Sequence, residues 1–183
     1  MLPQCTPVGE SAAAVIAASE EGLARYGLGL DRAVRVAASA GRSQRVYDDP
    51  TRYDAMLTGE TAAIALREAG VAARDLDVVE LHDAFTVEEV EYVEAMGLCP
   101  DGQAVHLLKA GEFDIGGRCA VSPSGGLISM GHPIGPTGVG QIGEITRQLR
   151  GEAGVRQQLG ARTGLAHMVG VGAVCYVHVL QKP

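Results

Sequence analysis

The chain has 183 residues, and its 22 acidic and 15 Lys and Arg side chains give a net charge of −7. This acidic balance argues against nucleic-acid binding, which usually needs a basic face. With 46% hydrophobic and 20% charged residues, the chain can bury a core and is not of a disordered composition. No apolar run approaches the ~20 residues of a membrane span. No basic-then-apolar leader opens the sequence, so a cytoplasmic protein is expected.

The four cysteines are scattered along the chain, at Cys5, Cys99, Cys119 and Cys175. They form no CxxC pair and have no spacing typical of a metal site. This pattern is typical of a reduced cytosolic protein, and it predicts no bound metal.

Apolar runs and turn residues divide the first half of the chain into alternating strands and helices. Gly27 and Gly70 are placed to end helices. The predicted elements are, in order, a buried strand over 12–18, a helix over 20–26, a strand over 33–38, a surface loop over 42–56 with a turn at 48–50, and a helix over 58–69.

The second half continues the alternation and closes with two adjacent strands. Thr86 is a predicted helix cap, with Glu89 completing a capping box. Only three residues separate the last two strands, which predicts an antiparallel pair. The predicted elements are a strand over 77–81, a helix from 86 to about 97, a glycine- and proline-rich loop over 116–138, a helix over 139–149, and strands over 163–168 and 172–180. This order indicates an α/β layered fold around a mixed sheet.

Three segments hold residues suited to chemistry. The first reads HDAF at 82–85, where a strand ends and a helix begins. Side chains at such positions face a crevice at the carboxyl ends of the strands. The alternative is a strand-end histidine whose hydrogen bonds are satisfied by the backbone.

The second segment is rich in glycine and proline, and reads SPSGG at 122–126 and GHPIGPTG at 131–138. Its histidine, His132, changes charge readily near neutral pH. The helix that follows presents free N–H groups and a positive dipole end to an anion or a carbonyl oxygen. The alternative is a purely structural glycine loop.

The third segment reads AHMVGVGA at 166–173 and predicts a tight glycine turn between two strands. By itself it is equally well explained as a hairpin without chemistry.

Together, the HDAF and GHPxGxTG segments resemble the C-terminal half of the thiolase superfamily, with their histidines fifty residues apart. The chain is most similar to sterol-carrier-protein type thiolases and thiolase-like lipid-transfer proteins. The resemblance runs from about Cys5 to Leu180.

The resemblance implies an α/β fold with a mixed five-stranded sheet layered with helices, one half of a five-layered αβαβα body. Residues 29–183 would form the thiolase C-terminal domain. Residues 1–28 would add a strand and a helix to the sheet of the N-terminal half. Family chains are about twice as long, so the strand at 12–18 would lack its sheet here and form an exposed edge that invites association.

The resemblance also implies roles for individual residues. His132 matches the histidine that activates the nucleophilic cysteine of the N-terminal half and helps to hold the thioester oxygen. His82 matches the residue that forms an oxyanion hole with it and a water. Gly170 and Gly172 match a turn that supplies backbone N–H groups. Further candidates for accessory roles are Asp83, Tyr92 and Ser124.

Two departures separate the chain from condensing thiolases, which need a second, acid–base cysteine. Depending on the subfamily, that cysteine lies where this chain has Met168 or where it has Ala84. Neither side chain can transfer a proton. This weighs against ordinary thiolysis but leaves a site able to polarise a thioester.

The expected function is therefore an acyl-CoA carbon–carbon bond enzyme of lipid metabolism, either an acyltransferase of the thiolase class or a retro-aldolase. The CoA thioester would be the substrate, with no further cofactor. For a retro-aldol step the base stays open between His82, His132 and Tyr92. Expected partners are an N-terminal thiolase half that supplies the nucleophilic cysteine, a second copy of the chain, or a zinc-containing acyl-CoA-binding protein of the OB-fold type. The alternative is a catalytically inactive subunit that binds lipid-CoA or scaffolds a complex.

Overall fold

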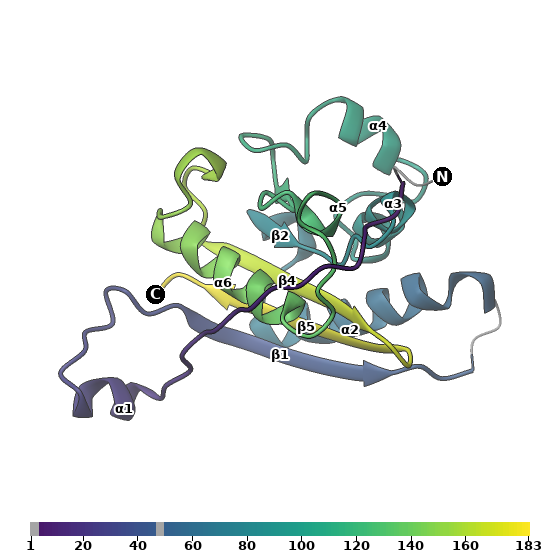
Figure 1. Ribbon diagram of the computed structural model, residues 1–183. Helices are drawn as coiled ribbons and strands as arrows, with labels where there is room; N and C mark the ends of the chain where they lie inside the picture. Colours follow the sequence, from purple (N-terminus) through teal and green to yellow (C-terminus); the bar gives the residue numbers. More distant parts are fainter. Residues whose placement is uncertain (1–3, 47–49) are drawn as a thin grey trace.

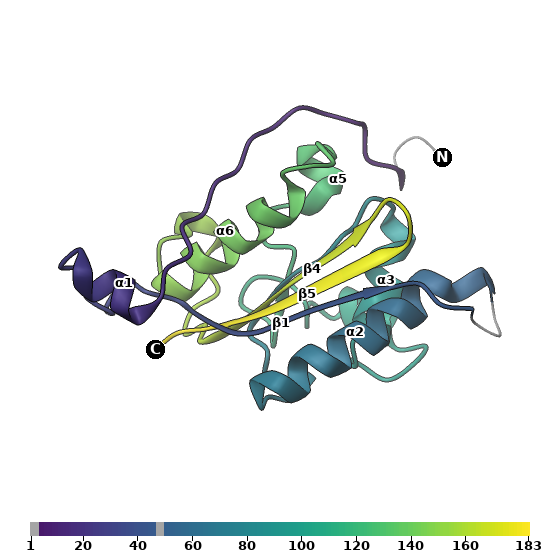
Figure 2. The same cartoon turned by 90° about the horizontal axis from the view of Figure 1, so that it is seen from below.

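A computed structural model describes residues 4–46 and 50–183, which form one mixed five-stranded sheet with helices on both faces (Figures 1 and 2). The strand order is β1-β5-β4-β2-β3. The strands are β1 (Arg35–Ser43), β2 (Val78–Glu80), β3 (Ala120–Val121), β4 (Thr163–Gly170) and β5 (Val174–Gln181). The predicted α/β class with a mixed five-stranded sheet is confirmed.

The sheet is mixed because its two sides are built differently. β5 pairs antiparallel with both β1 and β4, while β2 pairs parallel with both β4 and β3. The β4–β5 pair is the antiparallel hairpin that the sequence predicts. The parallel strands need crossover helices, which supply the layers on either face.

Two layers of helices cover the sheet. Figure 2 shows α6 (Thr137–Arg150) on one face, and α2 (Tyr53–Ala69) and α3 (Thr86–Ala95) on the other. Shorter helices connect the main elements. These are α1 (Glu20–Arg25), α4 (Ala104–Lys109), α5 (Gly126–Met130) and the 3₁₀ turns Pro50–Arg52, Ala73–Asp75 and Gly154–Arg156.

Because successive strand residues face opposite sides, each layer has its own apolar core. Leu165 of β4 packs toward α2 and α3 in the larger cluster, and the next residue, Ala166, packs under α6 in the smaller one. Helix α6 lies very close to the sheet: a Cβ on Gly164 would be only 2.5 Å from Cγ2 of Ile145. Glycine is therefore required there for packing rather than for backbone conformation.

Helix α6 packs mainly on β4 and β2, and leaves the outer strands of its face less covered. Tyr176 of β5 points to this face and is 50% exposed. His178, two residues along the same strand, is half-buried and lies 3.0 Å from the hydroxyl of Ser39 on β1. This part of the sheet is open next to α6.

The chain before α1 differs from the sequence prediction. Residues 12–18 form no strand and are all exposed, with Val15 44% and Ile16 97% accessible. They run as extended chain on the α6 side, as Figures 1 and 2 show. The described residues offer no neighbouring strand to pair with them, so the strand that their apolar composition predicted does not form. That residues 1–28 belong to a second sheet remains a prediction.

Three local predictions also differ from the structure. The predicted loop at 42–56 is shorter, because β1 reaches Ser43 and α2 begins at Tyr53; residues 48 and 49 of the predicted turn lie outside the described residues. The glycine-rich loop contains β3 and α5, both too short to give a periodic pattern. The cap of α3 is shifted by one residue: the side chain of Glu88, not Glu89, accepts from the backbone N–H of Phe85.

Candidate active site

The two histidines singled out in the sequence lie against each other. His82 follows the carboxyl end of β2, and His132 lies in the loop between α5 and α6. Their Nε2 atoms are 3.3 Å apart, and the rings meet edge to face with centroids 4.9 Å apart. His82 is buried, whereas His132 is half-buried. The structure therefore brings the two imidazoles together, and a catalytic role for the pair stays a prediction.

His82 is hydrogen-bonded through its backbone to a third histidine, His167 of β4, which is fully buried. The backbone N–H of His82 donates to Nδ1 of His167 at 3.4 Å. Since Nδ1 accepts, the other ring nitrogen, Nε2, carries the proton in the neutral ring and donates to the hydroxyl of Thr58 at 2.9 Å. The ring of Tyr92 packs edge to face on His167. This chain of contacts ties the His82 backbone to α2 and α3.

His132 is held by the first described residues of the chain. Its N–H donates to the carbonyl of Pro7 at 2.9 Å, and its carbonyl accepts from the N–H of Gly9 at 3.2 Å. The same extended segment donates from the N–H of Thr6 to the carbonyl of Ala84. Residues 5–9 thus join the HDAF loop to the GHP loop. Thr137, at the start of α6, places its hydroxyl 3.3 Å from Nδ1 of His132.

Asp83 fixes the second loop rather than facing a ligand. Its Oδ1 accepts from the N–H of Leu127 at 2.8 Å, at the start of α5. Gly126 allows this contact, because a Cβ there would lie 2.0 Å from Asp83 Oδ2 and the residue has a φ of +61°. Burial raises the pKa of Asp83, and the backbone bonds partly offset this.

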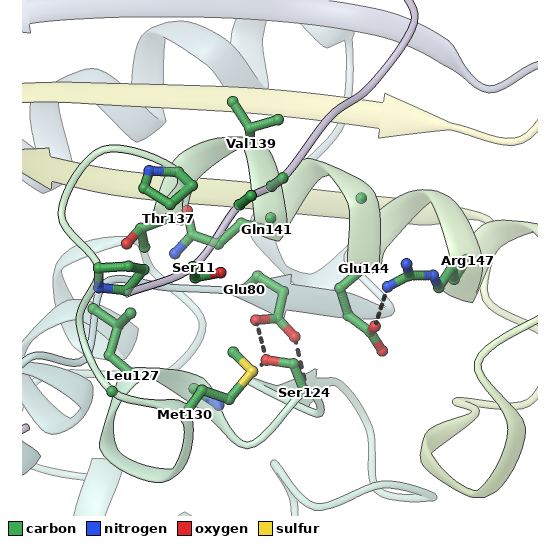
Figure 3. A pocket seen from close by; sticks show the side chains of 18 of the residues that line it. Ser11, Glu80, Ser124, Leu127, Met130, Thr137, Val139, Gln141, Glu144 and Arg147 are labelled. Carbon is green, nitrogen blue, oxygen red and sulfur yellow. Dashed lines mark hydrogen bonds and ion pairs between the residues drawn. The ribbon is translucent and has the colours of Figure 1, made fainter. Parts of the chain in front are cut away.

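Ser124 has a similar role in the same loop. Its hydroxyl and its N–H both donate to the carboxyl group of Glu80, at 2.7 and 3.0 Å, as Figure 3 shows for the side chains. Glu80 is 2% exposed, and burial raises its pKa to about 7. The pair lies in a groove of about 450 Å³ between the extended segment at 11–14, α5 and α6. Gly131 and Pro133, the two neighbours of His132, also line this groove.

Burial keeps the histidines of the site neutral. It lowers the pKa of His82 to about 4, with the nearby His132 lowering it further, and it lowers the pKa of His132. Burial lowers the pKa of His167 to about 3. Neutral imidazoles can each donate one hydrogen bond and accept one. The pair can therefore present a donor to a carbonyl oxygen without carrying charge.

The remaining predicted residues, all of them described by the structure, lie on other elements, and no contact with the two rings brings them into the pair. Gly170 and Gly172 belong to the β4–β5 hairpin, whose tip residue Val171 is 92% exposed. Met168 lies beside Gly138 at the start of α6, and Ala84 is buried under the extended segment. Tyr92 is fully buried, and its hydroxyl donates to Glu88 rather than pointing outward. Burial raises the pKa of Tyr92 well above its usual range.

The sequence did not single out three further residues near the site, His167, Glu88 and Glu80. His167 was visible only as part of a glycine turn, and Glu88 only as a residue of an amphipathic helix. Glu80, the last residue of β2, gave a signal in retrospect, as a charged residue in an otherwise apolar strand. In the described part of the chain, no three His, Cys, Asp or Glu side chains converge in a way that could hold a metal ion. Over the same residues, no helix has the length and apolarity needed to cross a bilayer.

Comparison with known families identifies the fold. Residues 38–182 match the model of the family described as "Thiolase C-terminal domain-like". The chain belongs to this family. The match covers all five strands except the start of β1, and it includes both histidine loops of the site.

Curated relatives include sterol carrier proteins, a thiolase subunit and an acetyltransferase. Sterol carrier protein 2 of Homo sapiens is 40% identical over 183 residues, covering 95% of this chain and 32% of that protein. The benzoylsuccinyl-CoA thiolase subunit BbsB of Thauera aromatica is 39% identical, covering 93% of this chain and 44% of that subunit. An acetyl-CoA acetyltransferase of Methanothermobacter thermautotrophicus is 38% identical, covering 99% and 47%. The chain thus spans from 32% to 47% of the length of these relatives.

A solved structure supports the fold assignment. The complex named "Ltp2-ChsH2(DUF35) aldolase" contains a chain that matches with a TM-score of 0.67 at 23% identity. The match covers 81% of this chain and 39% of that one. At this identity the likeness establishes the shared architecture.

Proposed function

We propose that this thiolase-like C-terminal domain belongs to an enzyme that makes or breaks a carbon–carbon bond next to the thioester of an acyl-CoA. The observation that carries the proposal is the contact between the rings of His82 and His132, whose Nε2 atoms lie 3.3 Å apart. Their sequence neighbours Leu81, Gly131 and Pro133 line the groove. CoA thioester is the substrate, and the reaction is of the thiolase or the retro-aldolase class. Relatives named as thiolases and a structure named as an aldolase support both classes.

The chemistry follows from what such a reaction needs. Breaking or forming a bond at the carbon next to a thioester places negative charge on the carbonyl oxygen as an enolate. A preorganised hydrogen-bond donor aimed at that oxygen can lower the barrier by about 3–4 kcal/mol. In this site one imidazole N–H would serve as the donor. Its partner ring and the hydroxyl of Thr137 fix the orientation of that N–H.

The site is completed by a thiolase N-terminal half that lies outside these 183 residues and supplies the nucleophilic cysteine. Two features support this. The relatives are two to three times as long as the matched region. In addition, the chain presents apolar surface without cover, at Val15 and Ile16 of the extended segment and at Tyr176 next to α6. A layer packed on the α6 side would bury these side chains.

A relative named as a subunit and a structure of an aldolase complex support assembly with other polypeptides. We expect the partner to be the N-terminal half, a second copy of the chain, or a zinc-containing acyl-CoA-binding protein of the OB-fold type. A cytoplasmic location accords with the composition. Purification of the tagged chain from its own host, followed by mass spectrometry, identifies which partner is bound.

The function is tested on the resulting complex. Cleavage of acetoacetyl-CoA by CoA reports thiolysis, and release of an aldehyde or ketone from a β-hydroxyacyl-CoA reports the retro-aldol reaction. The isolated chain should cleave neither substrate. In the complex, His132→Ala should lower turnover at least a hundredfold, whereas His106→Ala, an exposed histidine on α4, should leave it unchanged.

Two outcomes contradict the proposal. Thiolysis by the isolated chain would show that no second half is needed. A complex that binds acyl-CoA tightly but cleaves neither substrate would identify the chain as a binding or scaffolding subunit.

A further inference from the structure

The side chain of Glu88 extends the histidine pair into a line of three titratable groups. Its Oε2 lies 3.9 Å from Nδ1 of His82, and Nε2 of His82 lies 3.3 Å from His132. Nδ1 of His82 is buried and has no hydrogen-bond partner within the described residues. Glu88 is thus the group that faces the far side of the His82 ring.

Glu88 is held in place by two further contacts. Oε2 accepts from the backbone N–H of Phe85 at 3.0 Å, and Oε1 accepts from the hydroxyl of Tyr92 at 3.3 Å. Its side chain is only 16% exposed. The oxygen nearest His82 keeps a free lone pair, because a carboxylate oxygen can accept two hydrogen bonds.

The protonation of Glu88 and the tautomer of His82 are therefore coupled. When Glu88 is ionised, the favourable tautomer of His82 has its proton on Nδ1, facing the carboxylate, and a lone pair on Nε2. When Glu88 is protonated, the favourable tautomer has the proton on Nε2 instead. Both states leave the imidazole neutral, which suits a ring whose burial disfavours the cation.

We infer that Glu88 stores the proton that His82 takes from the substrate, and so replaces the acid–base thiol that is absent at Ala84 and Met168. This inference rests on the proposed function. In the forward step a substrate C–H or O–H bond breaks and its proton binds Nε2 of His82. The Nδ1–H bond of His82 then breaks, and an O–H bond forms on Oε2 of Glu88. The electron pair of the broken substrate bond stays on the substrate as the enolate or alkoxide, and the reverse transfer returns the proton.

The 3.9 Å gap must shorten by about 1 Å for this transfer, to reach a normal hydrogen-bond length. Catalytic hydrogen bonds are often long before substrate binds. Glu88 also binds a proton strongly enough for this role. Burial raises the pKa of Glu88 to about 7, and its hydrogen bonds to Phe85 and Tyr92 oppose this rise. The other acidic group that acts on Glu88 is Asp54 on α2, which raises the pKa further, and Tyr53 lies near the same carboxylates.

The coupling can be measured without any activity. In the 183-residue chain labelled with ¹⁵N at histidine, the ring nitrogen shifts of His82 report its tautomer, with His82→Asn used for assignment. The proton should move from Nε2 to Nδ1 as the pH rises through about 7. Glu88→Gln should abolish this transition. Tyr92→Phe removes a bond that stabilises the ionised carboxylate and should move the transition to higher pH. Thermal unfolding of each variant checks its fold.

The second arm uses the active complex. In the wild-type complex the cleavage rate should rise between pH 6 and 8, as Glu88 loses its proton. Glu88→Gln should lower this rate at least tenfold and remove its rise with pH. Glu91→Gln, which removes the same charge from the same helix, should change neither. If the tautomer of His82 is the same at pH 6 and pH 8 and the Gln variant keeps full activity, the inference is overturned. If the tautomer switches but no complex cleaves either substrate, the coupling stands and the proposed function fails.

Discussion

Replacing Gly126 by Ala tests the contact that fixes the loop carrying His132. Gly126 has a φ of +61°, and an added Cβ would lie 2.0 Å from Oδ2 and 2.7 Å from Oδ1 of Asp83. Both oxygens belong to the carboxyl group that accepts from the N–H of Leu127. The substitution therefore forces Asp83 to move and breaks that bond.

The magnitude has two parts. A non-glycine residue in the left-handed region costs about 1–2 kcal/mol. Loss of a buried hydrogen bond to a charged group costs about 1.5–3 kcal/mol. We expect Gly126→Ala to lower the free energy of unfolding by about 2.5–5 kcal/mol.

Two control glycines measure the conformational cost and steric crowding separately. Gly151, at the end of α6, has a φ of +76° and nothing within 4 Å of an added Cβ, so Gly151→Ala should cost only the conformational part. Gly164 has no such backbone conformation, but its added Cβ would lie 2.5 Å from Ile145. Gly164→Ala should cost about 1–3 kcal/mol through overpacking alone.

The assay is urea unfolding followed by far-ultraviolet circular dichroism, at one pH and temperature for all three variants. The expected order of stability loss places Gly126→Ala first. If Gly126→Ala loses no more stability than Gly151→Ala, the side chain of Asp83 can move without loss of free energy. The contact then does not fix the loop.

The other predictions concern the pH dependence of stability. Burial raises the pKa of Glu80 from 4.5 to about 7, so the folded state binds more protons between these values and stability falls as the pH rises through them. In Glu80→Gln, the urea midpoint should fall less between pH 4.5 and 7 than it does in the wild type. Burial lowers the pKa of His167 from 6.5 to about 3, so stability falls as the pH drops below 6.5. His167→Gln should reduce that acid loss, and a wild-type slope in either variant would contradict the stated cause.

Much of the fold could be predicted because its signals are local. The apolar spacing of α6 and the short link between β4 and β5 are visible in single stretches of sequence. β3 has only two residues, Ala120–Val121, and its position is fixed by pairing with β2, whose paired residues lie 42 positions earlier in the sequence. No local pattern can indicate a strand of that length.

The segment at 12–18 shows the opposite error. Its composition favours a buried strand, yet Ile16 is 97% exposed. An apolar run indicates that surface needs cover, but it does not say which surface provides the cover. In the described residues no strand lies beside it, so composition alone predicted a pairing that the chain does not form by itself.

Only part of the candidate site could be predicted from local sequence. Motifs identify His82 and His132, since their neighbours are distinctive, but the groups that hold them come from distant parts of the chain. His82 depends on His167, 85 residues away, and Ser124 depends on Glu80, 44 residues away. Such partners are ordinary residues of strands until the sheet places β2 beside β4.

These distant contacts also explain why the two rings can meet at a distance that suits chemistry. Each histidine lies in a loop, and loops by themselves vary in position. Here the first loop is joined to β4 through His167, the second to β2 through Glu80 and Ser124, and the two are joined to each other through Asp83 and Leu127. Because β2 and β4 are hydrogen-bonded neighbours, both loops share one rigid base. The sheet therefore sets the separation of the imidazoles, and a substitution at any of these contacts should change that separation before it changes the fold.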